Sequence, residues 1–227
     1  MSNAASPYIS NFNLTSVTHM EYTLADSNLL TSLILPKSKT SNLIFANNLF
    51  YNLYSLTSLD MSCLDTSKVI TMKMMFCNCF SLVSLNLYNF DRSKVIDMDM
   101  MLYNCNSLTS INLLGFNTSE VVDMSYMFYG CNSLTSINLL SFNTSKVANM
   151  HAMFLNCYSL TSINTSNFDT SKVTKMFDMF YNCNSLRILN LSHFDTSSLF
   201  SIEEMFWNCT SLTSIELLVL IHQKWKI

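Results

Sequence analysis

The sequence predicts an α/β repeat solenoid in which each 26-residue unit contributes one short parallel strand and one short helix. The first observation is a strict period, since cysteine recurs every 26 residues from Cys79 to Cys209. The second is that leucine, methionine and phenylalanine columns keep the same register. The third is that apolar residues recur at every second position early in each unit and at helical spacing later. Because one unit cannot enclose its own apolar residues, each column must stack on the next unit.

The repeat covers almost all of the 227 residues. About eight units extend over residues 11–217, after an N-terminal segment at residues 1–10. Residues 218–227 break the pattern and are predicted to form a divergent C-terminal cap or tail. If the tail leaves the last strand edge open, that edge would favour self-association.

The strand of each unit is predicted from the unit that begins at Leu108, which reads LTSINLLGFNTSEVVDMSYMFYGCNS. Its opening, L-x-x-I-x-L, is the strand signature of leucine-rich repeats. Ile111 and Leu113 alternate with Ser110 and Asn112. We therefore expect the first pair to point into the core and the second pair to lie on an outer, concave sheet.

A short helix is predicted in the second half of the same unit. Its apolar residues fall on one helical face, at Val121, Met124, Met127 and Phe128. The preceding segment, Asn117-Thr118-Ser119, is typical of a helix N-cap. An asparagine column that includes Gly130 follows, and these two residues exchange where φ is positive, as at a helix C′ position.

One stretch carries a family resemblance. Residues 133–157, SLTSINLLSFNTSKVANMHAMFLNC, resemble the 26-residue repeat of BspA-like leucine-rich-repeat proteins of bacterial surfaces. The resemblance covers most of the chain. It implies a cell-surface or secreted protein, often a lipoprotein or wall-anchored, that acts in adhesion to host components. The sequence itself shows no secretory signal and no membrane-spanning run, so a complete chain would be expected in the cytoplasm.

Composition and motifs argue against several classes of function. A net charge of -3, without clustered Lys and Arg, does not fit a nucleic-acid-binding protein. The only close cysteine pair, Cys77 and Cys79, has no partner pair, so no metal site is expected. The four histidines occupy different columns, and no catalytic or phosphate-binding motif occurs. We therefore expect no enzymatic activity and no cofactor, and we interpret the cysteine column as small buried hydrophobes.

The strand face is the predicted binding surface, because solenoids commonly bind partners through such extended surfaces. Leu114 and Leu140 share the column of Tyr88 on this face. The expected partner is a protein or a glycan. The predicted contact residues are Ser84, Asn86, Tyr88, Ser110, Asn112, Ser136, Asn138, Ser162, Asn164 and Asn190.

Three alternatives remain open at this point. The serine and asparagine columns could simply solvate the sheet or form hydrogen-bonded ladders. The chain could be an intracellular protein–protein scaffold, which eight unpaired thiols would suit. Regular Thr-Ser rows such as Thr109-Ser110 and Thr135-Ser136 could also form a structural or ice-binding array.

Overall fold

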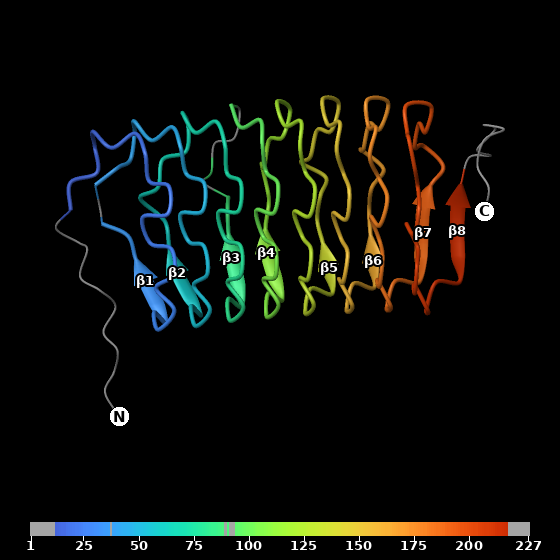
Figure 1. Cartoon of the computed structure of the whole chain (residues 1–227), viewed down its shortest axis with the longest axis horizontal. Coiled ribbons are helices and arrows are strands. Elements are labelled where there is room, and N and C mark those ends of the chain that lie inside the picture. The colour runs from blue at the N-terminus through green and yellow to red at the C-terminus, as the bar shows by residue number, and fades with distance from the viewer. Residues whose placement is uncertain (1–11, 37, 89, 91–93, 218–227) are drawn as a thin grey trace.

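The solenoid is built from strands that stack in parallel, one from each coil of the chain. A computed structural model describes residues 12–36, 38–88, 90 and 94–217. Within these ranges the strands follow one another along the row in Figure 1: β1 (Ser32–Ile34), β2 (Ser58–Asp60), β3 (Ser84–Asn86), β4 (Ser110–Asn112), β5 (Ser136–Ile137), β6 (Ser162–Ile163), β7 (Ile188–Leu191) and β8 (Ser214–Leu217).

Neighbouring strands pair in the register that the repeat dictates. In the described ranges β1 pairs with β2, β3 with β4, β5 with β6 and β7 with β8, always in parallel. Paired residues lie one period apart, as Ser84 and Ser110 do. A second ladder of single parallel bridges connects every coil, from His19 to Ser201. The predicted solenoid with a 26-residue spacing is therefore confirmed.

The core consists of columns of identical side chains that stack along the solenoid axis. Leu134 is 1% exposed, and Met127 and Cys131 are fully buried. The phenylalanine rings stack face to face, with ring centroids of Phe128 and Phe154 5.4 Å apart and their planes at 2°. Each ring therefore covers the next one, and the dispersion contacts of a packed interior repeat from coil to coil.

The predicted helix is wrong, because the described residues contain no helix. The amides of Met124, Tyr126 and Phe128 donate to carbonyl groups of the next coil, at 3.0, 2.9 and 2.9 Å. The amides of Met127 and Tyr129 donate instead within the same coil, to the carbonyl three residues back, as in β-turns. Every second amide thus donates to the neighbouring coil. In a helix, each amide would instead donate to the carbonyl four residues back in its own segment.

The asparagine column has the positive φ that the sequence predicts, but at the corner of a turn. Its φ values include 57° at Asn104, 68° at Gly130 and 63° at Asn156. A second positive-φ column lies four residues earlier, at Tyr126 (55°) and its equivalents. That column has no Gly or Asn preference in this chain, so the sequence did not reveal it.

The predicted N-cap segment also has another role. Asn117 accepts a hydrogen bond from the Ser119 amide at 2.9 Å through its side-chain oxygen, which forms an Asx turn. The buried Thr118 hydroxyl bonds both the carbonyl and the amide of Asn143 in the next coil, each at 2.8 Å. Residues typical of a helix start therefore turn the chain and connect coils.

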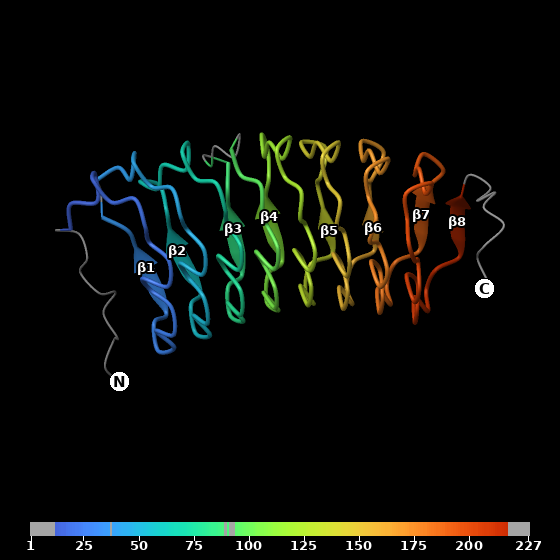
Figure 2. The ribbon, with the colours of Figure 1, turned by 45° about the horizontal axis from the view of Figure 1, so that its top comes forward.

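The coils lie along a nearly straight row in both views (Figures 1 and 2). We call the surface formed by the exposed residues of β1–β8 and of the turns that follow them the strand face. The predicted N-terminal segment 1–10 and tail 218–227 lie outside the described residues. In the described ranges we find no helix that could cross a membrane.

Candidate binding surface

All ten residues predicted to contact a partner lie together on the strand face. Every one of them is exposed, and each serine and asparagine follows its equivalent in the neighbouring coil. They come from β3 to β7 and from the turns that follow these strands: Ser84, Asn86, Tyr88, Ser110, Asn112, Ser136, Asn138, Ser162, Asn164 and Asn190.

The asparagines of this face have a structural role of their own. The side-chain oxygen of Asn112 accepts the amide of Leu114 at 3.1 Å, and that of Asn138 accepts the amide of Leu140 at 3.1 Å. Asn86 accepts both the Tyr88 amide and the Asn112 side-chain amide, each at 3.1 Å. These oxygens therefore hold the turn after each strand, as an Asx turn does.

The turn that each asparagine holds presents the residue two positions later to solvent. In three consecutive coils that residue is apolar: Tyr88 is 56% exposed, Leu114 61% and Leu140 59%. We call these three residues the apolar row. Serines continue the column on either side, at Ser62 and Ser166. The sequence placed Leu114 and Leu140 in the Tyr88 column of this face, but of the three only Tyr88 was predicted to contact a partner.

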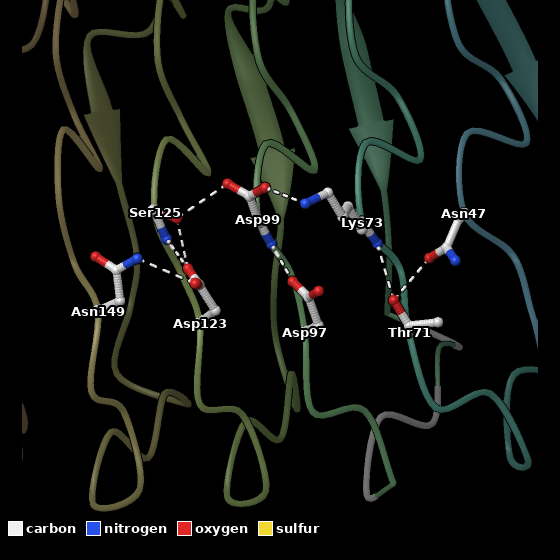
Figure 3. Close-up of polar contacts among 8 residues, drawn as sticks. All are labelled: Asn47, Thr71, Lys73, Asp97, Asp99, Asp123, Ser125 and Asn149. Atoms are coloured by element: carbon white, nitrogen blue, oxygen red, sulfur yellow. Dashed lines mark hydrogen bonds and ion pairs between the residues drawn. The ribbon is translucent and has the colours of Figure 1, made fainter.

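A polar network occupies a different part of the coils, beside the bridge ladder (Figure 3). Asp99 is 9% exposed, and its carboxylate pairs with the Lys73 ammonium at 2.8 Å and accepts the Ser125 hydroxyl at 2.9 Å. The hydrogen bond to Asp99 raises the pKa of Lys73, and burial raises the pKa of Asp97. Lys73 thus pairs with Asp99 of the neighbouring coil, and the hydrogen bonds of this network connect successive coils.

His151 lies near this network and is fixed on both sides of its ring. Its Nδ1 is 3.0 Å from the Phe177 carbonyl, which can only accept, so Nδ1 carries the proton. Nε2 then accepts the Tyr126 hydroxyl at 2.5 Å. Burial raises the pKa of Tyr126, so this hydroxyl stays protonated and is a poor nucleophile.

The cysteines form the column of small buried hydrophobes that the sequence predicts. All eight are free thiols, and six are buried. The Cys157 thiol donates to the Phe128 carbonyl at 3.1 Å, and the other members of the 26-residue column make the same bond. Burial raises the pKa of Cys79 and Cys131 to about 12. Because the reactive species is the thiolate, these buried thiols are chemically inert.

The raised thiol pKa values predict a loss of stability in alkali. Below an ordinary thiol pKa of about 8.5 the thiols are protonated in both the folded and the unfolded chain. Above it only the unfolded chain ionises, until the folded pKa of about 12 is reached at Cys131. The unfolding free energy should then fall by about 1.4 kcal/mol per pH unit for each such thiol. Urea unfolding of wild type and Cys131→Ala at pH values of roughly 8 to 11 measures it. We expect a shallower fall in the variant, and identical slopes would contradict the assignment.

A family model matches this chain, and 11 chains of solved structures are similar to it, among them the two that follow. The family described as "Mycoplasma protein of unknown function, DUF285" matches residues 1–112 and again residues 104–216. A leucine-rich repeat protein from Bacteroides ovatus is 18% identical over 90% of this chain and 65% of its own, with a TM-score of 0.41. An internalin from Listeria monocytogenes is 15% identical over 86% of this chain and 63% of its own, with a TM-score of 0.28. The chain thus matches less than two thirds of the length of either. No curated protein matches it.

Proposed function

The chain belongs to the DUF285 family of BspA-like repeat proteins, and from that premise we propose that it is a non-enzymatic binding module that recognises a protein or glycan through its strand face. The observation that carries this proposal is the apolar row at Tyr88, Leu114 and Leu140, whose three side chains are exposed in consecutive coils of a column that serine continues on either side.

The apolar row has the features of the centre of a binding surface, namely exposed apolar side chains with polar side chains around them. Neighbouring coils are about 4.8 Å apart, so the row extends over roughly 10 Å. Tyrosine is among the residues that contribute most to binding when a partner covers them, and a polar rim excludes water around such a centre. Here the rim consists of Asn86, Asn112 and Asn138, whose amide groups can bond a peptide or a sugar hydroxyl.

The proposed setting is the cell surface or the exterior, which the resemblance of the repeat to BspA-like surface proteins supports. The eight free cysteines favour a second candidate, an intracellular protein–protein scaffold. However, buried thiols as inert as Cys131 would survive in either compartment. Intact cells are treated with a protease and then fractionated, and the repeat is detected with an antibody. The antibody signal is lost only if the protein is exported, so this experiment separates the two settings.

The strand-face proposal predicts that Leu114→Ser with Leu140→Ser weakens binding by about tenfold to a hundredfold. Serine already occupies this column at Ser166 and Ser192, so the fold should be preserved. The variant and wild type are compared for affinity by surface plasmon resonance, against host-surface protein fractions and immobilised glycans. The control is Ile96→Thr with Val122→Thr, which removes two exposed apolar residues from another column. If the strand-face variant binds as wild type does, or the control loses as much affinity, the proposal is wrong.

A further inference from the structure

The strand half of four consecutive coils is electrically neutral. The charged residues of these coils lie in the other half, as Asp99, Asp123 and Lys146 do. Asp60 of β2 and Arg187 before β7 are exposed at the two limits of the neutral stretch. Among the described residues, the strand face thus carries no charged side chain from β3 to β6. In the sequence, no Asp, Glu, Lys, Arg or His occurs at residues 79–90, 105–116, 131–142 and 157–168.

This neutral surface is rich in groups that exchange hydrogen bonds with hydroxyl groups. The serines of the strand column, Ser84, Ser110, Ser136 and Ser162, are exposed. Within the described ranges their side-chain hydroxyl groups make no hydrogen bond to the rest of the chain. A hydroxyl group both donates and accepts. Because these serines occupy one column, the face presents such a group in every coil, at a spacing of about 4.8 Å.

The apolar row supplies the second requirement for binding a sugar. A pyranose ring has an apolar face of C–H groups and a rim of hydroxyl groups. Tyr88 can pack its ring against that face, and Leu114 and Leu140 extend the apolar contact over the next two coils. The hydroxyl rim would then lie over Asn112 and Asn138, which separate the apolar row from the serine column.

The same composition differs from that of a protein–protein interface. The centres of such interfaces are enriched in arginine and depleted in serine. In these four strand halves serine occurs in every coil and arginine in none. Charged groups also steer a protein partner toward its binding surface and suppress wrong partners. A neutral partner that is rich in hydroxyl groups therefore fits this surface better than a protein does.

The repeat also determines the shape of the partner. The coils lie in a nearly straight row (Figures 1 and 2), and equivalent residues of neighbouring strands lie side by side. A linear polymer that repeats its own hydroxyl groups can contact successive coils in the same way. Each contact after the first is then intramolecular, which increases the overall affinity. A single sugar at the end of a branched glycan would use only one coil.

We propose that the partner of the strand face is a neutral linear polysaccharide that lies along the solenoid axis over β3–β6 and packs on the apolar row. This inference rests on the proposed function, because it names the chemical class of the partner for the same surface. Acidic polysaccharides and proteins are the alternatives that the experiment separates from it.

The test is isothermal titration calorimetry of the full chain with two panels of oligosaccharides. The neutral panel contains linear oligomers of glucose, galactose, mannose and N-acetylglucosamine, and the acidic panel contains oligogalacturonate and heparin fragments. We expect at least one neutral series to bind, with an affinity that rises by more than about tenfold from disaccharide to hexasaccharide. Because neither surface is charged there, raising the salt concentration from about 0.05 M to about 0.5 M should change this affinity by less than about twofold.

Variants of the apolar row locate the site. Tyr88→Ala should weaken binding of the hexasaccharide by about tenfold or more, whereas Tyr88→Phe should retain it, because packing on a sugar ring requires only the aromatic face. The matched control is Tyr22→Ala, at a tyrosine that is 61% exposed in another column. Alanine occupies that column at Ala152, so the control should fold and bind as wild type does.

The outcomes separate this inference from the proposed function. If no neutral oligosaccharide binds, or if affinity does not grow with chain length, the inference is wrong. If Tyr88→Ala then still weakens binding to a host-surface protein fraction or to an acidic oligosaccharide, the proposed function stands without it. If neither Tyr88→Ala nor Leu114→Ser with Leu140→Ser weakens any binding, both are wrong.

Discussion

Replacing Leu134 with Asp should unfold the solenoid at ambient temperature. Leu134 is 1% exposed and lies between Leu108 and Leu160, which are fully buried. The new carboxylate would be buried without a partner. The substitution would also remove an apolar side chain from a stacked column. The expected loss is about 4 kcal/mol or more of unfolding free energy. Urea unfolding followed by circular dichroism measures it.

The control for this prediction is Ser136→Asp, two residues further along the same strand segment. Ser136 is exposed on the strand face, so its replacement should change stability by less than about 0.5 kcal/mol. If Leu134→Asp melted like wild type, the inward and outward assignment of this repeat would be wrong.

Replacing Thr144 with Val should cost about 2 to 3 kcal/mol of unfolding free energy. Thr144 is 1% exposed, and its hydroxyl donates to the Asp169 carbonyl at 2.9 Å and accepts the Asp169 amide at 2.7 Å. Valine has nearly the same shape but leaves both backbone groups of the next coil without this partner. Chemical denaturation measures the difference.

Thr135→Val is the matched control, because Thr135 is exposed and its loss should leave stability within about 0.5 kcal/mol of wild type. A Thr144→Val protein as stable as this control would show that the threonine column does not connect the coils.

The sequence was sufficient to predict the solenoid because stacking imposes the same residue on every coil. The period, the parallel strands and the buried columns of Leu134, Met127 and Cys131 are confirmed. The positive φ of the asparagine column is also confirmed at Asn104. These features depend on local chemistry or on strict repetition, and both are visible in one chain.

The helix could not be excluded from the sequence, because turns in series also place apolar residues three or four positions apart. A helix and a series of turns differ in which carbonyl groups the backbone amides donate to. The amide of Tyr126 donates to His151 of the next coil at 2.9 Å, and no local pattern encodes that choice. The caps were misassigned for the same reason, since Asx turns and helix N-caps use the same residues.

The strand face was predicted from the alternation of the strand, but the apolar row was not singled out. The sequence placed Leu114 on this face in the Tyr88 column, and the structure adds that Asn112 holds the turn that exposes it. The network around Asp99 was missed because its partners come from different coils. Lys73 and Asp99 are 26 residues apart, and the charge at this position changes from coil to coil.

The most direct test of the account is the spacing of the strand face. Spin labels are placed on Ser58 and on one of three residues of the same column: Ser136, Ser162 or Ser214. Cys63 and Cys209 are half-buried and are replaced by Ser first, and labelling of that parent variant measures the background from the six buried cysteines. Double electron–electron resonance should give label distances that grow by about 4.8 Å per coil, because parallel strands are stacked in one row. Distances that do not increase in proportion to the number of intervening coils would contradict the solenoid and the strand face built on it.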